Sequence, residues 1–237
     1  MRKSRQTSFD RSLYTSSDET TSFHSTVCSM FEHVQSDSCE PTLFHKLMGK
    51  LACEGRLLRH ITQNIDCIEQ RSPDLNAKTI RLHGQVDRMR CQTCNGVYEF
   101  QPRLFQGADL PICPNCVERS QARVLNGKRP LYIGTLKPDV LLYGQPHPDD
   151  KEILEAIKDA MKTVPDLLLV VGTKLKIPGA LSIAKSISHA TRSSGGVAVW
   201  ISKEEPSPKA RNLFDYILQG DCDAVAWSVC ILPQPNP

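Results

Sequence analysis

Four cysteines form the clearest chemical pattern in this sequence. Cys91 and Cys94 make one C-x2-C pair, and Cys113 and Cys116 make a second pair after eighteen intervening residues. This spacing fits the pattern of zinc-binding modules, in which each pair presents two thiolates and two pairs complete a tetrahedron of sulfur ligands. Because no coordination position would stay open for water, we expect one structural Zn2+ ion. Four unrelated cysteines are a much weaker interpretation of the same spacing.

Polar residues that suit catalysis follow an expected strand and precede the cysteines. The segment TQNID, residues 62–66, comes directly after the predicted strand Leu57–Ile61, so an amide and a carboxylate lie at a strand end. His83 and Gly84 follow seventeen residues later. Imidazole is the usual general base near neutral pH, and the glycine would leave the ring open to a ligand. Alone, however, one histidine is more often a structural or surface residue.

Apolar spacing predicts the elements that must position these residues. Helical spacing covers residues 23–34 and 42–53. The later half of the chain alternates three strands (140–142, 167–171, 197–201) with three helices (151–163, 180–190, 209–219). This alternation predicts an α/β fold with a doubly wound, mostly parallel sheet. Ligands of such sheets bind at the carboxyl ends of strands, which here are residues 62–66, 172–173, 202–204 and 220–223.

The same patterns predict how the chain divides into domains. Residues 1–22 hold many Ser and Thr without apolar periodicity, which is typical of a flexible arm. We expect the α/β domain over residues 23–89 and 132–226, interrupted by a small zinc-binding module over residues 90–131. Residues 227–237 would form a tail.

Composition excludes several classes of protein and partner. The 237 residues are 40% hydrophobic and 23% charged, which excludes collagenous, coiled-coil and wholly disordered chains. The net charge, 29 − 26 = +3, is too small for a nucleic-acid-binding surface. The longest apolar run is Leu167–Val171, far short of a membrane span. We therefore expect no direct nucleic-acid partner and no membrane. The other six cysteines are expected to be reduced, mostly buried thiols, namely Cys28, Cys39, Cys53, Cys67, Cys222 and Cys230.

The order of the motifs resembles a known family. TQNID, HG, the paired C-x2-C motifs, LKPDVLLYG, VVGTKL, WISKEE and GDCD occur in this order between about Pro41 and Ala224. This order resembles the sirtuins, the NAD-dependent protein-lysine deacylases of the Sir2 family, and it is most similar to the fungal nuclear branch that acts on acetylated histone. The resemblance implies a Rossmann-like fold, NAD as cofactor, histone deacetylation, and a role in chromatin silencing and transcription regulation in the nucleus.

The resemblance also implies roles for particular residues. His83 matches the general base that takes a proton from the nicotinamide ribose, after which acetyl passes to ADP-ribose and nicotinamide leaves. Asn64 matches the amide that orients the ribose and a water, and Asp66 matches the carboxylate that holds the nicotinamide carboxamide. The implied NAD contacts are Gln63, Asn64, Ile65, Asp66, Gly172, Thr173, Lys174, Ser202, Lys203, Glu204 and Cys222. The segment that would pair with the substrate peptide as a β-strand is Val140, Leu141, Leu142, Tyr143 and Gly144.

Three residues depart from the family pattern. Cys67 stands where the family usually has Gly, and its side chain is small enough to fit. Lys174 stands where the family usually has Ser; it would add a charge near the cofactor phosphates or point to solvent, and we favour solvent. Ser202 replaces an Asn, which shortens a polar contact to ribose and would weaken cofactor binding modestly.

The residues before TQNID show the largest departure. The family begins with a strand and a Gly-Ala-Gly loop that cradles the NAD phosphates, followed by a Pro-Asp-Phe-Arg segment. Here the first glycine is Gly49, and no Pro-Asp-Phe-Arg sequence occurs. We therefore expect the first strand and its loop to be missing, and these 237 residues alone to bind NAD poorly and turn over little substrate.

Two other functions remain as alternatives to a deacetylase. The first is a catalytically impaired sirtuin remnant that acts as a zinc-bearing binding module, which the missing glycine loop favours and the presence of His83, Asn64 and Asp66 disfavours. The second is a zinc-ribbon protein that binds nucleic acid. It is weakly supported, because the residues between the cysteine pairs include Glu99 and Asp109 as well as Arg103.

Overall fold

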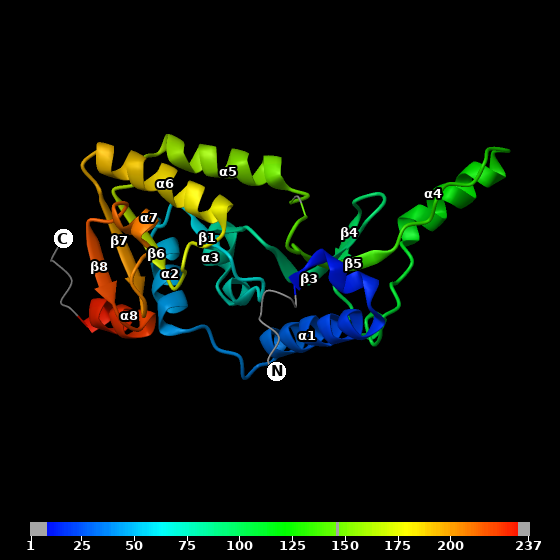
Figure 1. The fold of residues 1–237 in the computed structure, drawn as a ribbon, viewed down its shortest axis with the longest axis horizontal. Helices are drawn as coiled ribbons and strands as arrows, with labels where there is room; N and C mark the ends of the chain where they lie inside the picture. Colours follow the sequence, from blue (N-terminus) through cyan, green and yellow to red (C-terminus); the bar gives the residue numbers. More distant parts are fainter. Residues whose placement is uncertain (1–8, 146, 232–237) are drawn as a thin grey trace. The chain divides into compact units, whose positions relative to one another are not determined.

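The computed structural model describes residues 9–145 and 147–231, with side chains up to residue 229. The chain forms two compact units (Figure 1). One, named here the cysteine unit, comprises Met1–Cys39, Asn64–Ile68 and His83–Pro148. The other, the parallel-sheet unit, comprises Glu40–Gln63, Glu69–Leu82 and Asp149–Pro237. Each unit has its own hydrophobic core, so each is described by itself.

The parallel-sheet unit contains the predicted α/β architecture. Strands β6 (Leu167–Val171), β7 (Val197–Ser202) and β8 (Tyr216–Gln219) pair in that order, and both pairings are parallel. Strands β1 (His60–Thr62) and β2 (Thr79–Arg81) form a second parallel pair. The helices are α2 (Leu43–Cys53), α3 (Pro73–Lys78), α5 (Asp150–Lys162), α6 (Pro178–Ser193), α7 (Pro208–Arg211) and α8 (Cys222–Ile231), and a 3-10 turn, η3, spans Ile68–Arg71.

Helices pack against the three-stranded sheet and bury its central strand. Helix α6 contacts β6 and β7, whereas α8 contacts β7 and packs against α2 (Figure 1). Trp200 of β7 is 1% exposed and Ala198 is fully buried, as expected for the middle strand of a covered parallel sheet. Because β6 and β8 both pair with this buried strand in parallel, the carboxyl ends of the three strands lie at the same end of the sheet.

The cysteine unit is built on an antiparallel sheet. Strand β3 (Gly84–Cys91) lies between β4 (Val97–Glu99) and β5 (Leu136–Val140). Helix α1 (Ser17–Gln35) packs against β3, and Figure 1 shows α4 (Pro114–Leu125) extending away from the strands. Two 3-10 turns, η2 (Arg11–Thr15) and η4 (Pro102–Leu104), complete the unit.

The N-terminal part differs from the flexible arm predicted over residues 1–22. From residue 9 onward the structure is ordered into η2 and the first turns of α1, and Leu13 is 1% exposed. Ser16 caps α1, because its hydroxyl accepts a hydrogen bond from the Glu19 N–H group. The absence of apolar periodicity was misleading because a few residues, Leu13 above all, anchor this segment. Residues 1–8 lie outside the described part of the chain.

The predicted domain boundaries also differ from the two units. Helix α1, strand β3 and residues 132–145 join the cysteine unit, although the sequence pattern assigned them to the α/β domain. Their apolar side chains share one core with the cysteine knuckles, including Val27, Val86 and Leu136. Sequence periodicity predicts elements, but it does not show which core each element joins.

One predicted helix is wrong. Residues 209–219 form the short helix α7 and then strand β8, rather than one helix. Asp215 accepts a hydrogen bond from the Ala198 N–H group, and Tyr216 pairs with Val199 of β7. Sheet pairing thus overrides the helical spacing of the apolar residues. The other expected elements agree within a few residues, except that β5 ends at Val140, where the predicted strand 140–142 begins. Helix α8 occupies part of the predicted tail, of which residues 232–237 lie outside the described residues.

Among the residues that the structure describes, no helix combines the length and apolar character needed to cross a bilayer.

Candidate functional site

The four predicted cysteine ligands converge in the cysteine unit. Their Sγ atoms all lie within 4.8 Å of one another. Cys91 lies 3.7 Å from Cys116, and Cys94 lies 3.7 Å from Cys113, so each close pair joins one knuckle to the other. Four sulfur ligands at about 2.3 Å from a tetrahedral zinc are roughly 3.8 Å apart. The geometry therefore fits one structural Zn2+ ion.

Hydrogen bonds already favour thiolates at this cluster. The Thr93 and Cys94 N–H groups donate to Cys91 Sγ at 3.3 and 3.4 Å. The Gly96 N–H group is the main reason that the pKa of Cys94 falls to about 6, whereas burial raises the pKa of Cys91. Because a bound metal needs all four thiolates, metal binding at neutral pH would release protons.

Two further side chains, which are not among the predicted site residues, reach the sulfurs. Tyr98 Oη lies 3.4 Å from Cys113 Sγ, and Asn115 Nδ2 lies 3.4 Å from Cys94 Sγ. Tyr98 comes from β4, and Asn115 lies inside the second C-x2-C pair but reaches the first. A polar residue within a C-x2-C pair is a sequence signal for the second contact. The residues around Tyr98 in the sequence give no signal for its contact with Cys113.

The second half of the TQNID segment, from Asn64 onward, and His83 both belong to the cysteine unit, whereas Thr62 and Gln63 belong to the parallel-sheet unit. Within the cysteine unit, the Val86 N–H group donates to the Ile65 carbonyl at 2.9 Å, which ties the end of TQNID to β3 just after His83. Asp66 Oδ1 accepts a hydrogen bond from the Ile68 N–H group at 3.3 Å, and Asn64 is exposed. The predicted base, amide and carboxylate thus belong to one compact unit.

The backbone conformation at Cys67 is one that favours glycine, the residue that the family usually has at this position. Cys67 has φ = 65°, which lies in the left-handed region that glycine adopts without strain. Its side chain is only 1% exposed and belongs to the core of the cysteine unit. The side chain therefore does fit, as expected, but it holds a conformation that costs an L-residue about 1–2 kcal/mol.

Gly84 has a structural role in addition to the expected one beside His83. It has φ = 78°, and a Cβ atom at this position would overlap the backbone carbonyl of Asp139. The glycine thus lets β5 approach β3 closely. Next to it, the Leu141 N–H group donates to the His83 carbonyl at 2.9 Å. The main chain of His83 is thereby bonded to the predicted peptide-binding segment.

One edge of the predicted peptide-binding segment is used by the chain itself. The Tyr143 N–H group donates to the Phe9 carbonyl at 2.7 Å, and Leu141 bonds to His83 as described. Backbone groups of an extended strand alternate between its two edges, so Val140 and Leu142 present theirs on the other side. There the Leu142 N–H group lies 3.4 Å from Gln145 Oε1.

The remaining predicted residues gather in the parallel-sheet unit, at the carboxyl ends of its strands. Gly172 directly follows β6 and has φ = 61°, and its N–H group donates to the Ile201 carbonyl of β7. A Cβ atom on Gly172 would come within 3.8 Å of Cys222 Sγ at the start of α8. Gln63 Nε2 donates to Thr173 Oγ1 at 2.9 Å, a contact between residues 110 positions apart. These positions meet as predicted for a doubly wound sheet.

Two exposed ion pairs lie at the carboxyl ends of these strands. Lys174 Nζ lies 2.6 Å from Glu204 Oε1, and Lys203 Nζ lies 2.8 Å from Asp221 Oδ2. The Lys203 ammonium is the main reason that the pKa of Asp221 is lowered. Lys174 is 55% exposed, so it does face solvent, yet its charge is paired with Glu204. Ser202 is buried, and its carbonyl accepts a hydrogen bond from the Gly220 N–H group.

The sequence profile of the Sir2 family matches residues 3–178. This chain belongs to the Sir2 family. It is 38% identical over 231 residues to the NAD-dependent protein deacetylase hst4 of Emericella nidulans, which covers 92% of this chain and 38% of that protein. It is 34% identical over 224 residues to the protein of the same name from Schizosaccharomyces pombe, covering 90% of this chain and 54% of that one. The chain thus spans about half the length of these relatives, or less.

Solved Sir2-family structures share the fold. A Sir2 homologue in complex with NAD superposes with a TM-score of 0.70 at 21% identity, covering 96% of this chain and 77% of that one. Sir2 bound to an acetylated peptide gives a TM-score of 0.70 at 23% identity, covering 95% and 82%. The Rossmann-like α/β fold inferred from the sequence is therefore confirmed.

Proposed function

We propose that this protein is an NAD-dependent protein-lysine deacetylase that acts on acetylated histone or another acetyl-lysine protein. The observation that carries the proposal is the Sir2-family match over residues 3–178, which includes the TQNID and HG motifs; Asn64, Asp66 and His83 of these motifs belong to one compact unit. Relatives named NAD-dependent protein deacetylase match nine tenths of this chain. A purely non-catalytic binding module is not favoured by these relatives.

The carboxyl ends of the strands in the parallel-sheet unit suit the adenosine part of NAD. The left-handed turn at Gly172 leaves the backbone open to close approach, and the Thr173 hydroxyl is held by Gln63. Glu204, after β7, supplies a carboxylate of the type that binds ribose hydroxyls in Rossmann-like folds. When bound, NAD would supply the ribose carbon that the acetyl oxygen attacks and the ADP-ribose that carries the acetyl group away. We assign Gly172, Thr173, Lys174, Ser202, Lys203, Glu204 and Cys222 to this role.

The residues of the cysteine unit would perform the proton transfer and hold the substrate. His83 would take the proton from a ribose hydroxyl, since neutral imidazole is a general base at physiological pH. Asn64 would orient that ribose, and Asp66 would accept a hydrogen bond from the nicotinamide carboxamide. The edge of Val140 and Leu142 that faces away from His83 would pair with the main chain of the substrate peptide, with the peptide replacing Gln145, which now bonds to the N–H group and the carbonyl of Leu142. The zinc would hold the two knuckles together and take no part in catalysis.

The activity test compares alanine variants of two histidines in this protein. His83→Ala should lower NAD-dependent deacetylation of an acetyl-lysine histone peptide by about 10²–10⁴-fold, the range for loss of a general base. Peptide binding, measured by fluorescence polarisation, should persist. His33→Ala removes an exposed histidine on α1 and serves as the matched control. Near-normal turnover by His83→Ala would contradict the proposed role.

Residues 1–237 alone provide a second arm of this test. They contain no glycine before Gly49, so the NAD phosphates would lack a glycine-rich turn. We therefore expect these residues to bind NAD weakly in calorimetric titrations. Micromolar affinity would show that such a turn is dispensable.

Histone specificity, nuclear location and a role in chromatin silencing form the finer part of the proposal. The support is the relatives named NAD-dependent histone deacetylases, such as HST4 of Saccharomyces cerevisiae, 33% identical over 211 residues. A panel of acetylated histone and non-histone peptides would test the substrate. Fluorescence of the tagged protein in fungal cells would test the location, and a cytoplasmic signal would contradict it.

A further inference from the structure

A polar pocket lies beside the proposed peptide-binding segment, within the cysteine unit. Its volume is about 240 Å³, several times the roughly 30 Å³ that a water molecule occupies in the liquid. Val140, Leu141 and Leu142 form one wall, so a peptide paired with this segment would pass the pocket mouth. The pocket is therefore large enough, and close enough, to receive a substrate side chain.

The one carboxylate that lines the pocket is already neutralised. Arg90 donates from Nε and Nη2 to both oxygens of Asp139, at 2.7 and 3.1 Å. Arg88 Nη2 lies 3.5 Å from the same carboxylate. Arg90 and Asp139 are each at most 9% exposed, so this bidentate pair is a fixed part of the wall. Asp139 cannot compensate a second cation without giving up these bonds.

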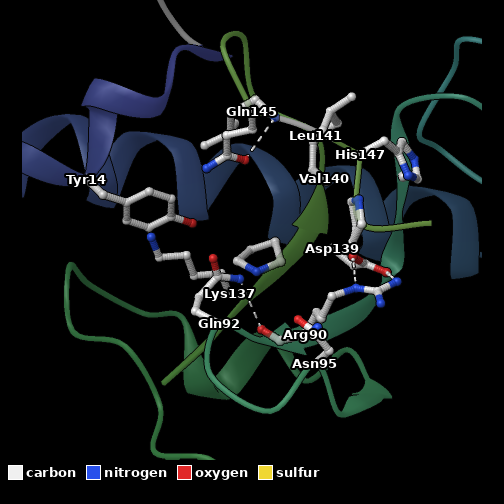
Figure 2. Close-up of a pocket in the computed structure, with 14 residues that line it drawn as sticks. Tyr14, Arg90, Gln92, Asn95, Lys137, Asp139, Val140, Leu141, Gln145 and His147 are labelled. Carbon is white, nitrogen blue, oxygen red and sulfur yellow. Dashed lines mark hydrogen bonds and ion pairs between the residues drawn. The ribbon is translucent and has the colours of Figure 1, made fainter. Parts of the chain in front are cut away.

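Lys137 is the cation without an acidic partner. Its Nζ lies 3.7 Å from the centroid of the Tyr14 ring and forms no ion pair with any described residue. Burial lowers the pKa of Lys137, with no carboxylate opposing the shift. Figure 2 shows Lys137 and the Gln145 amide on the Tyr14 side of the pocket, and Asp139 with Arg90 on the opposite side. That arrangement leaves one side of the pocket positively charged.

The strand geometry makes this positive side reachable from a bound peptide. Lys137, Asp139 and Leu141 alternate along β5 and its continuation, so their side chains leave the same face. In a peptide that added a strand beside them, every second side chain would project to that face.

We propose that the pocket binds an aspartate or glutamate side chain of the substrate, close in sequence to the acetylated lysine, through an ion pair with Lys137. This inference rests on the proposed deacetylase function, and it adds a specificity determinant outside the NAD and acetyl-lysine contacts. The Tyr14 ring holds the Lys137 ammonium in place before the peptide arrives. The Gln145 amide offers a second donor to the incoming carboxylate.

The test compares peptides that differ only in one charge. Acetyl-lysine peptides carry glutamate or glutamine at each neighbouring position in turn, and kcat/KM is measured with the whole protein. At one or two positions the unchanged protein should favour glutamate by roughly fivefold to tenfold, as expected for a half-buried ion pair. Lys137→Met should reduce this ratio to near one, mainly through a loss of kcat/KM for the glutamate peptide. Lys137→Arg should retain the preference.

Lys128→Met is the matched control, because it removes the same charge from an exposed turn after α4. It should leave the glutamate preference unchanged. A wild-type preference that survives Lys137→Met, or no preference at any position, would overturn the inference while leaving the deacetylase function intact. Failure to deacetylate every peptide would overturn both. Free glutarate tests whether the pocket binds a small acid instead of a peptide side chain. If glutarate binds but the protein shows no preference between glutamate and glutamine peptides, the inference is also overturned.

Discussion

At the scale of single residues, the hydrogen bonds to the cysteine sulfurs stand out. Tyr98 and Asn115 each donate to a sulfur of the opposite knuckle from the one nearest to them in sequence. A site of four thiolates carries excess negative charge, which such donors disperse. Outer donors of this kind also fix the orientation of metal ligands and raise metal affinity. Both residues therefore should contribute to zinc retention, although neither is a ligand.

Tyr98→Phe removes the donor to Cys113 and keeps the ring. We expect zinc to pass to a chromophoric chelator about 10- to 100-fold more readily, which is typical for loss of an outer-shell donor. The Co2+-substituted protein should also show a shifted charge-transfer band. Tyr132→Phe makes the same change at a tyrosine that is 79% exposed, and it should behave as wild type. Identical zinc transfer by both variants would contradict the role of Tyr98.

His24 is a buried histidine with an unusual environment. It is fully buried, and its Nδ1–H group donates to the Gly107 carbonyl at 2.6 Å. Its ring contacts Phe105 edge to face, with centroids 5.0 Å apart, and among the described residues its Nε2 atom has no hydrogen-bond partner. Burial is the main reason that the pKa of His24 is lowered. The folded protein therefore favours the neutral ring.

Acidification should destabilise the cysteine unit through His24. A histidine with a lowered folded-state pKa leaves stability intact above its unfolded pKa, about 6.5, and stability falls as pH drops below that value. His24→Gln keeps an amide donor for Gly107 but cannot titrate. Chemical denaturation between pH 7.5 and 5 should show a smaller loss of unfolding free energy in the variant. Parallel pH profiles for the two proteins would refute the prediction.

At the scale of elements, the close antiparallel pairing of β3 and β5 depends on one glycine. Gly84 combines a left-handed backbone with contact to the Asp139 carbonyl, and the Leu141–His83 hydrogen bond follows directly. The position of the proposed base and the position of the proposed peptide-binding segment are thereby coupled. A change at Gly84 should disturb both elements together.

Gly84→Ala should lower the free energy of unfolding by at least about 2 kcal/mol, because backbone strain and steric overlap act together. Gly127→Ala is the matched control. Gly127 also has positive φ, 66°, but a Cβ atom there would meet nothing within 4 Å, so only the strain of about 1 kcal/mol applies. Denaturant titration of both variants measures the difference. Equal losses would show that β5 does not depend on the close approach.

At the scale of the whole molecule, two separate cores predict two separate responses to metal loss. The core of the cysteine unit includes three of the four cysteines, whereas the core around Trp200 in the parallel-sheet unit contains no sulfur ligand. Since metal binding at thiolate sites is coupled to local folding, removal of zinc should loosen the first core much more than the second.

Metal analysis should find close to one zinc per chain, and Cys113→Ala should lose it. Hydrogen exchange after chelation should accelerate in β3, β4 and α4, while β6 and β7 stay protected. The parallel-sheet unit serves as the internal control in the same sample. Full zinc content and unchanged stability in Cys113→Ala would contradict the assignment, and uniform exchange across both units would show that they share one folding unit.

The sequence by itself determined the features that depend on neighbouring residues. The cysteine spacing predicted the four converging sulfurs, because a C-x2-C turn places two ligands on one side of a knuckle whatever surrounds it. Five consecutive apolar residues predicted β6 with its observed bounds, Leu167–Val171, because a continuous apolar run is typical of strands in parallel sheets. Burial on both faces was not reached along the whole strand, since Leu167 is 49% exposed. The order of strands and helices likewise indicated the strand ends at which Gly172, Thr173 and Cys222 meet.

Only the tertiary structure decided how distant segments share space. Residues 216–219 form a strand because they pair in parallel with β7. The helical spacing of their apolar residues does not reveal this pairing. Tyr98, the Arg90–Asp139 pair and the isolated Lys137 acquired their roles from partners outside their own elements. Periodicity records which side of one element is buried. The contact between two side chains distant in sequence depends on the packing of whole elements, and no local pattern of residues specifies that packing.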